Sequence, residues 1–228
     1  MPSNRYLFAI LFFCPYLSTA QIKKDISIPH ILTIHNIKCR SKSRFCTKEQ
    51  DYPRVIYVEN SLAERKMNSA ILTAFDIKGR REPPTEDDCK ADDAIRYRIT
   101  TFTKNTLSII MLNYFFGNGA GHSYYNTTVL NFDIRTGNKM LPESILLKDS
   151  LSSLKNLLIH KAKIQLDSLK RGDMIDDVSD GINNWIYSID KNGFVFYGHT
   201  SDGGLQEIEV PVSHHEINRF LKKDFYKP

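Results

Sequence analysis

Alternating apolar and polar residues, or runs of β-branched and aromatic residues, predict β-strands along much of this chain. The first expected strand, Ile26–Ile34, contains Pro29, and a residue without an amide hydrogen favours the edge of a sheet. Arg135–Asn138 predicts a tight turn, and Asn192-Gly193 is a strong hairpin signal between apolar runs. The other expected strands are Tyr52–Val58, Ala94–Thr103, Thr106–Phe116, Ser123–Ile134, Trp185–Asp190, Phe194–His199 and Glu207–Val212.

Two longer segments have the apolar spacing of amphipathic helices. One begins at Ser61, where Ser61 and Glu64 match the S-x-x-E pattern of a capping box. The other, Asp149–Leu169, gives the clearest helical pattern in the chain. The stripes that these helices should bury are Ala63, Met67, Ala70, Ile71 and Ala74 in the first, and Leu151, Leu154, Leu158, Ala162 and Leu169 in the second.

A second capping box, Ser213 with Glu216, predicts a short C-terminal helix that ends near Leu221. The fold class is therefore α+β: a small N-terminal strand-helix part, and a mainly antiparallel sheet backed by one long helix and this short one. The charged, apolar-poor segment Lys78–Asp93 predicts a linker. We expect a signal peptide at 1–20, an N-terminal subdomain with its linker at 21–93 and a C-terminal subdomain at 94–228.

The N-terminal segment has the pattern of an export signal. Arg5 supplies a positive charge, Tyr6–Tyr16 is an almost unbroken apolar run, and Ser18 and Ala20 are the small residues that precede a cleavage site. The apolar run is shorter than the ~20 residues of a spanning helix. We expect a mature chain that begins at Gln21, is periplasmic or extracellular, and has no membrane span after cleavage; an uncleaved anchor is the alternative.

Composition narrows the class of protein further. The 228 residues are 41% hydrophobic and 25% charged, which is typical of a globular protein and not of a disordered or multi-span one. The formal net charge is only +5, with both signs interspersed, so the sequence does not favour a nucleic-acid partner. No motif in it calls for a cofactor or a metal.

The cysteines allow more than one arrangement. Beyond the export signal, Cys39 and Cys46 enclose a basic six-residue segment, and we expect a disulfide between them, with Cys89 free or paired between chains. A metal site made of His35, Cys39 and Cys46 is the alternative, but this spacing is not a recognised zinc pattern.

One stretch, Leu107–Met140, carries a family resemblance. A strand leads to the loop Gly119-Ala120-Gly121-His122, aromatic residues follow, and a turn of the type Asn-x-Asp-x-x-Thr-Gly-x-Lys comes next. This order resembles the extracytoplasmic module shared by RsiV-type anti-sigma factors and PdaC-type deacetylases, although the glycine before the histidine departs from the family pattern. The turn residues are Asn131, Asp133, Thr136, Gly137 and Lys139.

The resemblance covers the module alone, without a sigma-binding segment or a deacetylase domain. In RsiV-type members the module is a receptor for lysozyme, which implies a binding function. We therefore expect an exported, non-catalytic binding module of the bacterial envelope, whose partner is a lysozyme-like protein or a peptidoglycan fragment.

The candidate contacts cluster around the glycine loop. Tyr124 and Tyr125 leave this loop, and tyrosine beside glycine is a common composition of recognition surfaces, so we expect both to contact the ligand together with the loop. Asp133 is a further candidate. The alternative function is an envelope polymer hydrolase that uses His122 and Asp133, although no nucleophile–base motif accompanies the histidine.

Overall fold

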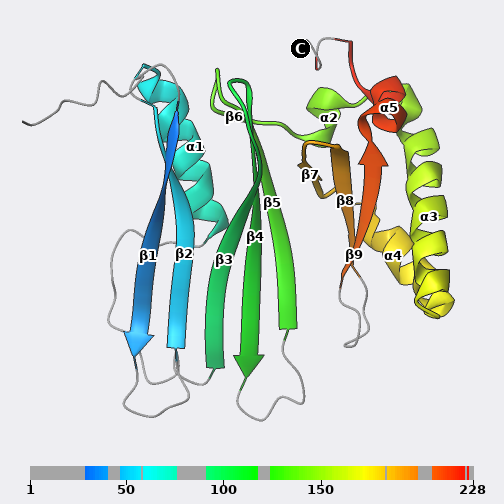
Figure 1. Cartoon of the computed structure of the whole chain (residues 1–228), viewed down its shortest axis with the longest axis horizontal. Coiled ribbons are helices and arrows are strands. Elements are labelled where there is room, and N and C mark those ends of the chain that lie inside the picture. The colour runs from blue at the N-terminus through cyan, green and yellow to red at the C-terminus, as the bar shows by residue number, and fades with distance from the viewer. Residues whose placement is uncertain are drawn as a thin grey trace, which may run out of the picture.

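The computed structural model describes residues 29–40, 47–57, 59–75, 91–117, 124–182, 184–199, 207–223 and 225. Its fold is mixed α+β, as the sequence predicts, with a six-stranded and a three-stranded sheet (Figure 1). The strands are β1 His30–Arg40, β2 Thr47–Ile56, β3 Ala91–Phe102, β4 Thr106–Gly117, β5 Tyr124–Asp133, β6 Asn138–Lys139, β7 Tyr187–Ile189, β8 Gly193–His199 and β9 Glu207–Ser213. The helices are α1 Ser61–Ala74, α2 Pro142–Ile145, α3 Leu151–Ser168, α4 Ile175–Ile182 and α5 His214–Ile217, with 3₁₀ turns at Lys148–Ser150, Gly172–Met174 and Asn218–Phe220. None of these helices is long and apolar enough to cross a bilayer.

The larger sheet contains strands from both sides of the expected subdomain boundary at residue 93. Its order is β1-β2-β3-β4-β5-β6, and β1 lies at an edge, as Pro29 predicts. Neighbouring strands are antiparallel except β2 and β3, which pair in parallel where Lys48–Gln50 meets Asp93–Ile95. The two sequence segments therefore share one sheet.

Helix α1 begins as expected, but its cap differs from the prediction. The residue in the capping position is Asn60, whose side-chain oxygen accepts a hydrogen bond from the Ala63 amide at 3.0 Å. Glu64 does not reach a capping Ser61; its carboxylate accepts from the Tyr57 amide at 2.7 Å. The predicted capping box is therefore wrong. The capping residue is Asn60, one position before the predicted Ser61, because Ser61 is already the first helical residue.

The burial predicted for the apolar stripe of α1 is confirmed, and the stripe packs against the larger sheet, which the sequence analysis expected the later helix Asp149–Leu169 to cover. Ala63, Met67 and Ile71 are buried, and Ala70 and Ala74 are partly buried beside them. The sheet side of this core includes Val55 of β2 and, from β3, β4 and β5, the residues Ile95, Leu107, Ile109, Met111, Leu130 and Phe132, which alternate along β4 and β5.

The same helix also completes the edge of β2. At Val55 the strand has moved beyond the short stretch that pairs with β3. The Asn68 side chain of α1 takes the place of a neighbouring strand, because its amide nitrogen donates to the Val55 carbonyl at 2.8 Å and its oxygen accepts from the Val55 amide at 2.9 Å. One side chain thereby supplies hydrogen-bond partners for both backbone groups of Val55 at this buried strand edge.

Helix α3 covers the smaller sheet and not the long strands before it. Its buried residues Leu154, Leu158 and Ala162 agree with the predicted stripe. Leu166 continues that stripe, whereas Leu169 lies just past the helix end and is 52% exposed, so its predicted burial is wrong. Helices α2 and α4, which the sequence analysis does not predict, complete this second core.

The two sheets meet through polar side chains of the larger sheet and the backbone edge of β7. β8 pairs with one edge of β7, and the other edge faces β3, β4 and β5. Ser108 accepts a hydrogen bond from the Ile189 amide at 3.1 Å, and Thr100 donates to the Ile189 carbonyl at 2.7 Å. Asn131 donates to the Tyr187 carbonyl at 2.7 Å.

We expect Ser108→Ala to destabilise this junction. The change leaves the buried Ile189 amide without its acceptor, which costs about 1–3 kcal/mol of unfolding free energy. Ser69→Ala, on the exposed side of α1, is the matched control and should stay within about 0.5 kcal/mol. Urea unfolding of both variants measures the difference, and equal values would contradict the assigned role of the Ser108 hydroxyl.

Gly137 permits the predicted turn between β5 and β6. Its φ is +70°, and a Cβ at this position would lie 2.4 Å from the Ala63 carbonyl oxygen. We expect Gly137→Ala to lower the free energy of unfolding by about 2 kcal/mol or more, because both the backbone angle and the close approach to α1 oppose a side chain.

Gly172→Ala is the control for this prediction. The Cβ there would meet only the Asp167 carboxylate, a flexible side chain, at 2.6 Å. Thermal unfolding of the two variants should show a clearly larger loss for Gly137→Ala; the reverse order would refute the packing argument.

Candidate functional site

The predicted glycine loop falls outside the described residues. This holds for Gly119, Ala120, Gly121 and His122, whereas Tyr124 begins β5. The part that these residues play in binding remains a prediction.

The pairing of β4 with β5 brings together aromatic residues that flank the loop. Phe115 pairs with Tyr124, and Tyr114 pairs with Tyr125. The register therefore places four aromatic residues of the sequence at the end of this hairpin. Figure 1 shows the lower ends of β4 and β5 extending past the lower ends of β8 and β9. An aromatic hairpin end therefore projects beyond the smaller sheet.

Asp133 lies at the opposite end of β5 from Tyr124, and His122 falls outside the described residues, so a joint role of Asp133 and His122 remains a prediction. Ten extended residues separate the strand ends by about 30 Å. The Asp133 side chain accepts hydrogen bonds from the Arg135 amide at 3.0 Å and from the Arg135 guanidinium at 3.1 and 3.2 Å. Asp133 therefore stabilises the turn to β6, at the end of β5 that lies away from Tyr124.

The expected disulfide stays a prediction. Cys39 lies in β1 after an irregularity in the pairing with β2, and Cys46 and Cys89 fall outside the described residues. The register pairs Arg40 with Thr47, so the chain positions on either side of residues 41–46 lie side by side.

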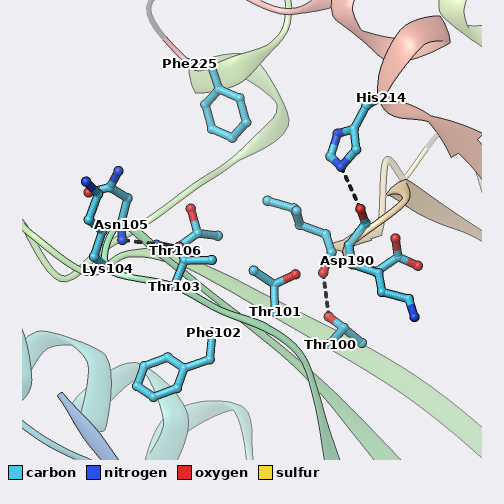
Figure 2. A pocket seen from close by; sticks show the side chains of 12 residues that line it. Thr100, Thr101, Phe102, Thr103, Lys104, Asn105, Thr106, Asp190, His214 and Phe225 are labelled. Carbon is cyan, nitrogen blue, oxygen red and sulfur yellow. Dashed lines mark hydrogen bonds between the residues drawn. The ribbon is translucent and has the colours of Figure 1, made fainter. Parts of the chain in front are cut away.

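A cleft of about 510 Å³ lies at the other end of the long strands, between the turns of two hairpins (Figure 2). One wall is the end of the β3–β4 hairpin, residues 100–106. The facing wall is the β7–β8 turn, residues 189–191, together with His214 of α5; Phe225 also lines the cleft. The sequence analysis does not identify this site, because it depends on how the two sheets meet.

Local hydrogen bonds hold both walls. On the β3–β4 turn, the Thr103 hydroxyl accepts from the amides of Asn105 and Thr106 at 3.3 and 3.0 Å. On the β7–β8 turn, one carboxylate oxygen of Asp190 accepts from the amides of Asn192 and Gly193 at 2.6 and 3.0 Å. Side-chain bonds of this kind fix the backbone of short turns.

His214 is held against the same turn. Its Nε2 lies 3.2 Å from the Lys191 carbonyl oxygen, and since a carbonyl only accepts, this nitrogen is the donor. The predicted capping box of Ser213 and Glu216 is confirmed and fixes the start of α5. Hydrogen bonds from Lys161 and Ser213 lower the pKa of Glu216 to about 2, so its carboxylate stays charged.

The charged residues do not form a metal centre in the part of the chain that the structure describes. No group of three or more histidine, cysteine, aspartate or glutamate side chains converges there. His215, next to His214, is exposed.

Glu207 is a carboxylate at the contact between the two sheets whose environment shifts its pKa. One of its oxygens accepts from the Thr127 hydroxyl at 2.5 Å, and the other is buried without a partner among the described atoms. Burial raises the pKa of Glu207. Burial likewise raises the pKa of the nearby Tyr197 hydroxyl to about 12, so this phenol stays protonated and hydrogen-bonded to Ser188.

No family model matches this sequence, and no curated protein matches it significantly. Solved structures that share its fold include two DUF3298 family proteins. One is a DUF3298 family protein from Pseudomonas aeruginosa PAO1, with a TM-score of 0.56, 10% identity, and coverage of 86% of this chain and 94% of that one. The other is a DUF3298 family member from Bacteroides fragilis NCTC 9343, with a TM-score of 0.54, 12% identity and the same coverage. These likenesses establish the fold alone.

We expect Glu207→Gln to stabilise the protein near neutral pH. The raised pKa means that the ionised form is disfavoured in the folded state, so wild type loses stability as the pH rises above the ordinary value of 4.5. Glutamine keeps an oxygen for Thr127 and carries no charge, so its advantage should be present at about pH 7 and vanish at about pH 4.

Glu209→Gln is the control on the same strand. Its side chain is 57% exposed and pairs with Arg98 at 3.7 Å, so the change should have little effect at either pH. Urea midpoints at both pH values test this, and a wild type as stable as Glu207→Gln near pH 7 would contradict the assignment.

Proposed function

We propose that this chain is an exported, non-catalytic binding module of the bacterial envelope, and that it recognises a lysozyme-like protein through the end of the β4–β5 hairpin. The observation that carries the proposal is the pairing of Phe115 with Tyr124 and of Tyr114 with Tyr125 beside the glycine loop. Tyrosine rings offer a large apolar contact with a polar tip, which suits them to protein interfaces.

Three further observations support the proposal. The fold is that of DUF3298 family proteins from bacteria. The motif order around the glycine loop resembles the extracytoplasmic module that serves as a lysozyme receptor in RsiV-type members. The pattern of residues 1–20 supports export, and an exported module would be accessible to a lysozyme-like protein outside the cytoplasm.

The position of Asp133 favours binding over hydrolysis. A hydrolase that depends on His122 needs a group to orient the imidazole, and the aspartate expected for this role stabilises a turn at the far end of β5. The aromatic pairs, by contrast, lie on both strands that flank the loop.

We expect Tyr124→Ala or Tyr125→Ala to weaken binding to egg-white lysozyme by about 2 kcal/mol or more, which is the effect of a hot-spot residue. Titration calorimetry with the mature protein measures this. Phe102→Ala is the matched aromatic control, because this ring is 40% exposed at the opposite end of the sheet and should not affect lysozyme binding.

Two competing functions, binding of a cell-wall component and hydrolysis of peptidoglycan, are tested in parallel. The first is measured with soluble peptidoglycan fragments in the same calorimeter. Binding of these fragments, without binding of lysozyme, would replace the proposed partner by a cell-wall component. Release of soluble products from peptidoglycan by wild type, with loss of this activity in His122→Ala, would overturn the non-catalytic assignment and restore the hydrolase.

A further inference from the structure

We propose that the cleft between the β3–β4 and β7–β8 turns is a second binding site, and that its ligand is an acidic saccharide. The site is independent of the proposed lysozyme contact, since it lies at the other end of β4 from the glycine loop. Its volume of about 510 Å³ is in the usual range for small-ligand sites.

The first argument is the concentration of neutral hydrogen-bonding groups. Thr101, Thr103 and Thr106 line the cleft, and Asn105 adds a side-chain amide. The Thr103 oxygen accepts two backbone hydrogen bonds, which leaves its own hydrogen to donate. Hydroxyl and amide groups both donate and accept, as do the hydroxyls and acetamido groups of sugars.

The second argument is the presence of aromatic rings beside these groups. Phe102 and Phe225 both line the cleft, and Figure 2 shows threonine side chains lying between the two rings. Phe225 is held by packing against Phe194, with ring centroids 6.2 Å apart. A pyranose ring has an apolar C–H face, which packs favourably on such a surface while its hydroxyls reach the threonines.

The third argument is charge. Lys104 on one wall and Lys191 on the other are exposed, and neither forms an ion pair with another described residue. The one carboxylate of the lining, Asp190, has an oxygen bound to two turn amides. The lining therefore contains two lysines and one carboxylate, and this balance favours a carboxylate on the sugar.

The rigid walls make this a formed site. Asp190 and Thr103 fix the two turns, and the Thr100 hydroxyl ties the walls together through the Ile189 carbonyl at 2.7 Å. Little ordering is then required when a ligand enters, so a weakly hydrophobic sugar can still bind.

The test is a nuclear magnetic resonance titration of the ¹⁵N-labelled protein with four probes. N-acetylmuramic acid and glucuronic acid are acidic sugars of two different sources, N-acetylglucosamine is a neutral sugar, and acetate is a bare carboxylate. We expect the amide signals of Thr101, Asn105 and Lys191 to shift with an acidic sugar, at about tenfold lower concentration than with either control probe.

The two acidic probes distinguish the sources. Tighter binding of N-acetylmuramic acid points to cell-wall glycan, and tighter binding of glucuronic acid points to a uronic-acid polysaccharide. Absence of shifts with both acidic sugars, or equal affinity for acetate or for the neutral sugar, would overturn the proposal.

Variants assign the binding to the cleft. Lys104→Gln and Lys191→Gln should each weaken acidic-sugar binding about tenfold, and Thr101→Val several-fold, with unchanged melting temperatures. Lys163→Gln, on the exposed side of α3, is the matched charge control and should bind as wild type does. If the two cleft lysine variants also bind as wild type does, the carboxylate contact is refuted. Lysozyme affinity, measured on the same variants, should not change, so failure of this proposal is separate from failure of the proposed function.

Discussion

The outward edge of β7 carries backbone groups that no strand pairs, and the larger sheet satisfies them with side chains. Ser108, Thr100 and Asn131 project from three adjacent strands and bind the amide and carbonyl of Ile189 and the carbonyl of Tyr187. Each of these bonds has a defined direction, whereas apolar contacts tolerate sliding. The polar contact therefore fixes how the smaller sheet sits on the larger one, and with it the positions of α3, α4 and α5.

The cleft is a consequence of the same contact. Thr100 lies at an irregularity in the pairing of β3 with β4, where the register shifts between Ile99 and Thr101. An extra residue in a strand re-aims the side chains next to it, and such bulges are common beside functional sites. Here Thr100 reaches β7 and Thr101 lines the cleft. The twelve residues of β4 place the aromatic hairpin end roughly 35 Å from this cleft, so the two proposed sites do not overlap.

Local patterns in the sequence account for most of the elements. Most of the three long strands between Ala94 and Asp133, and the stripe of α1, follow from periodicities that need no knowledge of the neighbours, whereas the first three residues of β3 lie in the predicted linker. The turn at Gly137 and the hairpin at Gly193 follow from backbone angles, +70° and +153°, that glycine adopts most readily. The shift of the α1 cap to Asn60 shows the limit of this approach, because neighbouring Asn and Ser residues are almost equally good caps.

The sequence by itself determined the α+β class, the order of the main elements and the hairpin turns, because these depend on interactions among residues a few positions apart. It also placed aromatic residues around the glycine loop, although only the strand register pairs them across the hairpin. Tertiary structure alone decided that β2 and β3 pair in parallel, that α3 covers the smaller sheet, and that Asp133 lies far from Tyr124 along β5. Tertiary structure also determined the role of Ser108 and Asn131, which bind the backbone of β7. A polar residue on a strand looks the same in the sequence whether its face meets water or the backbone of another sheet, and only the packing of distant segments distinguishes the two.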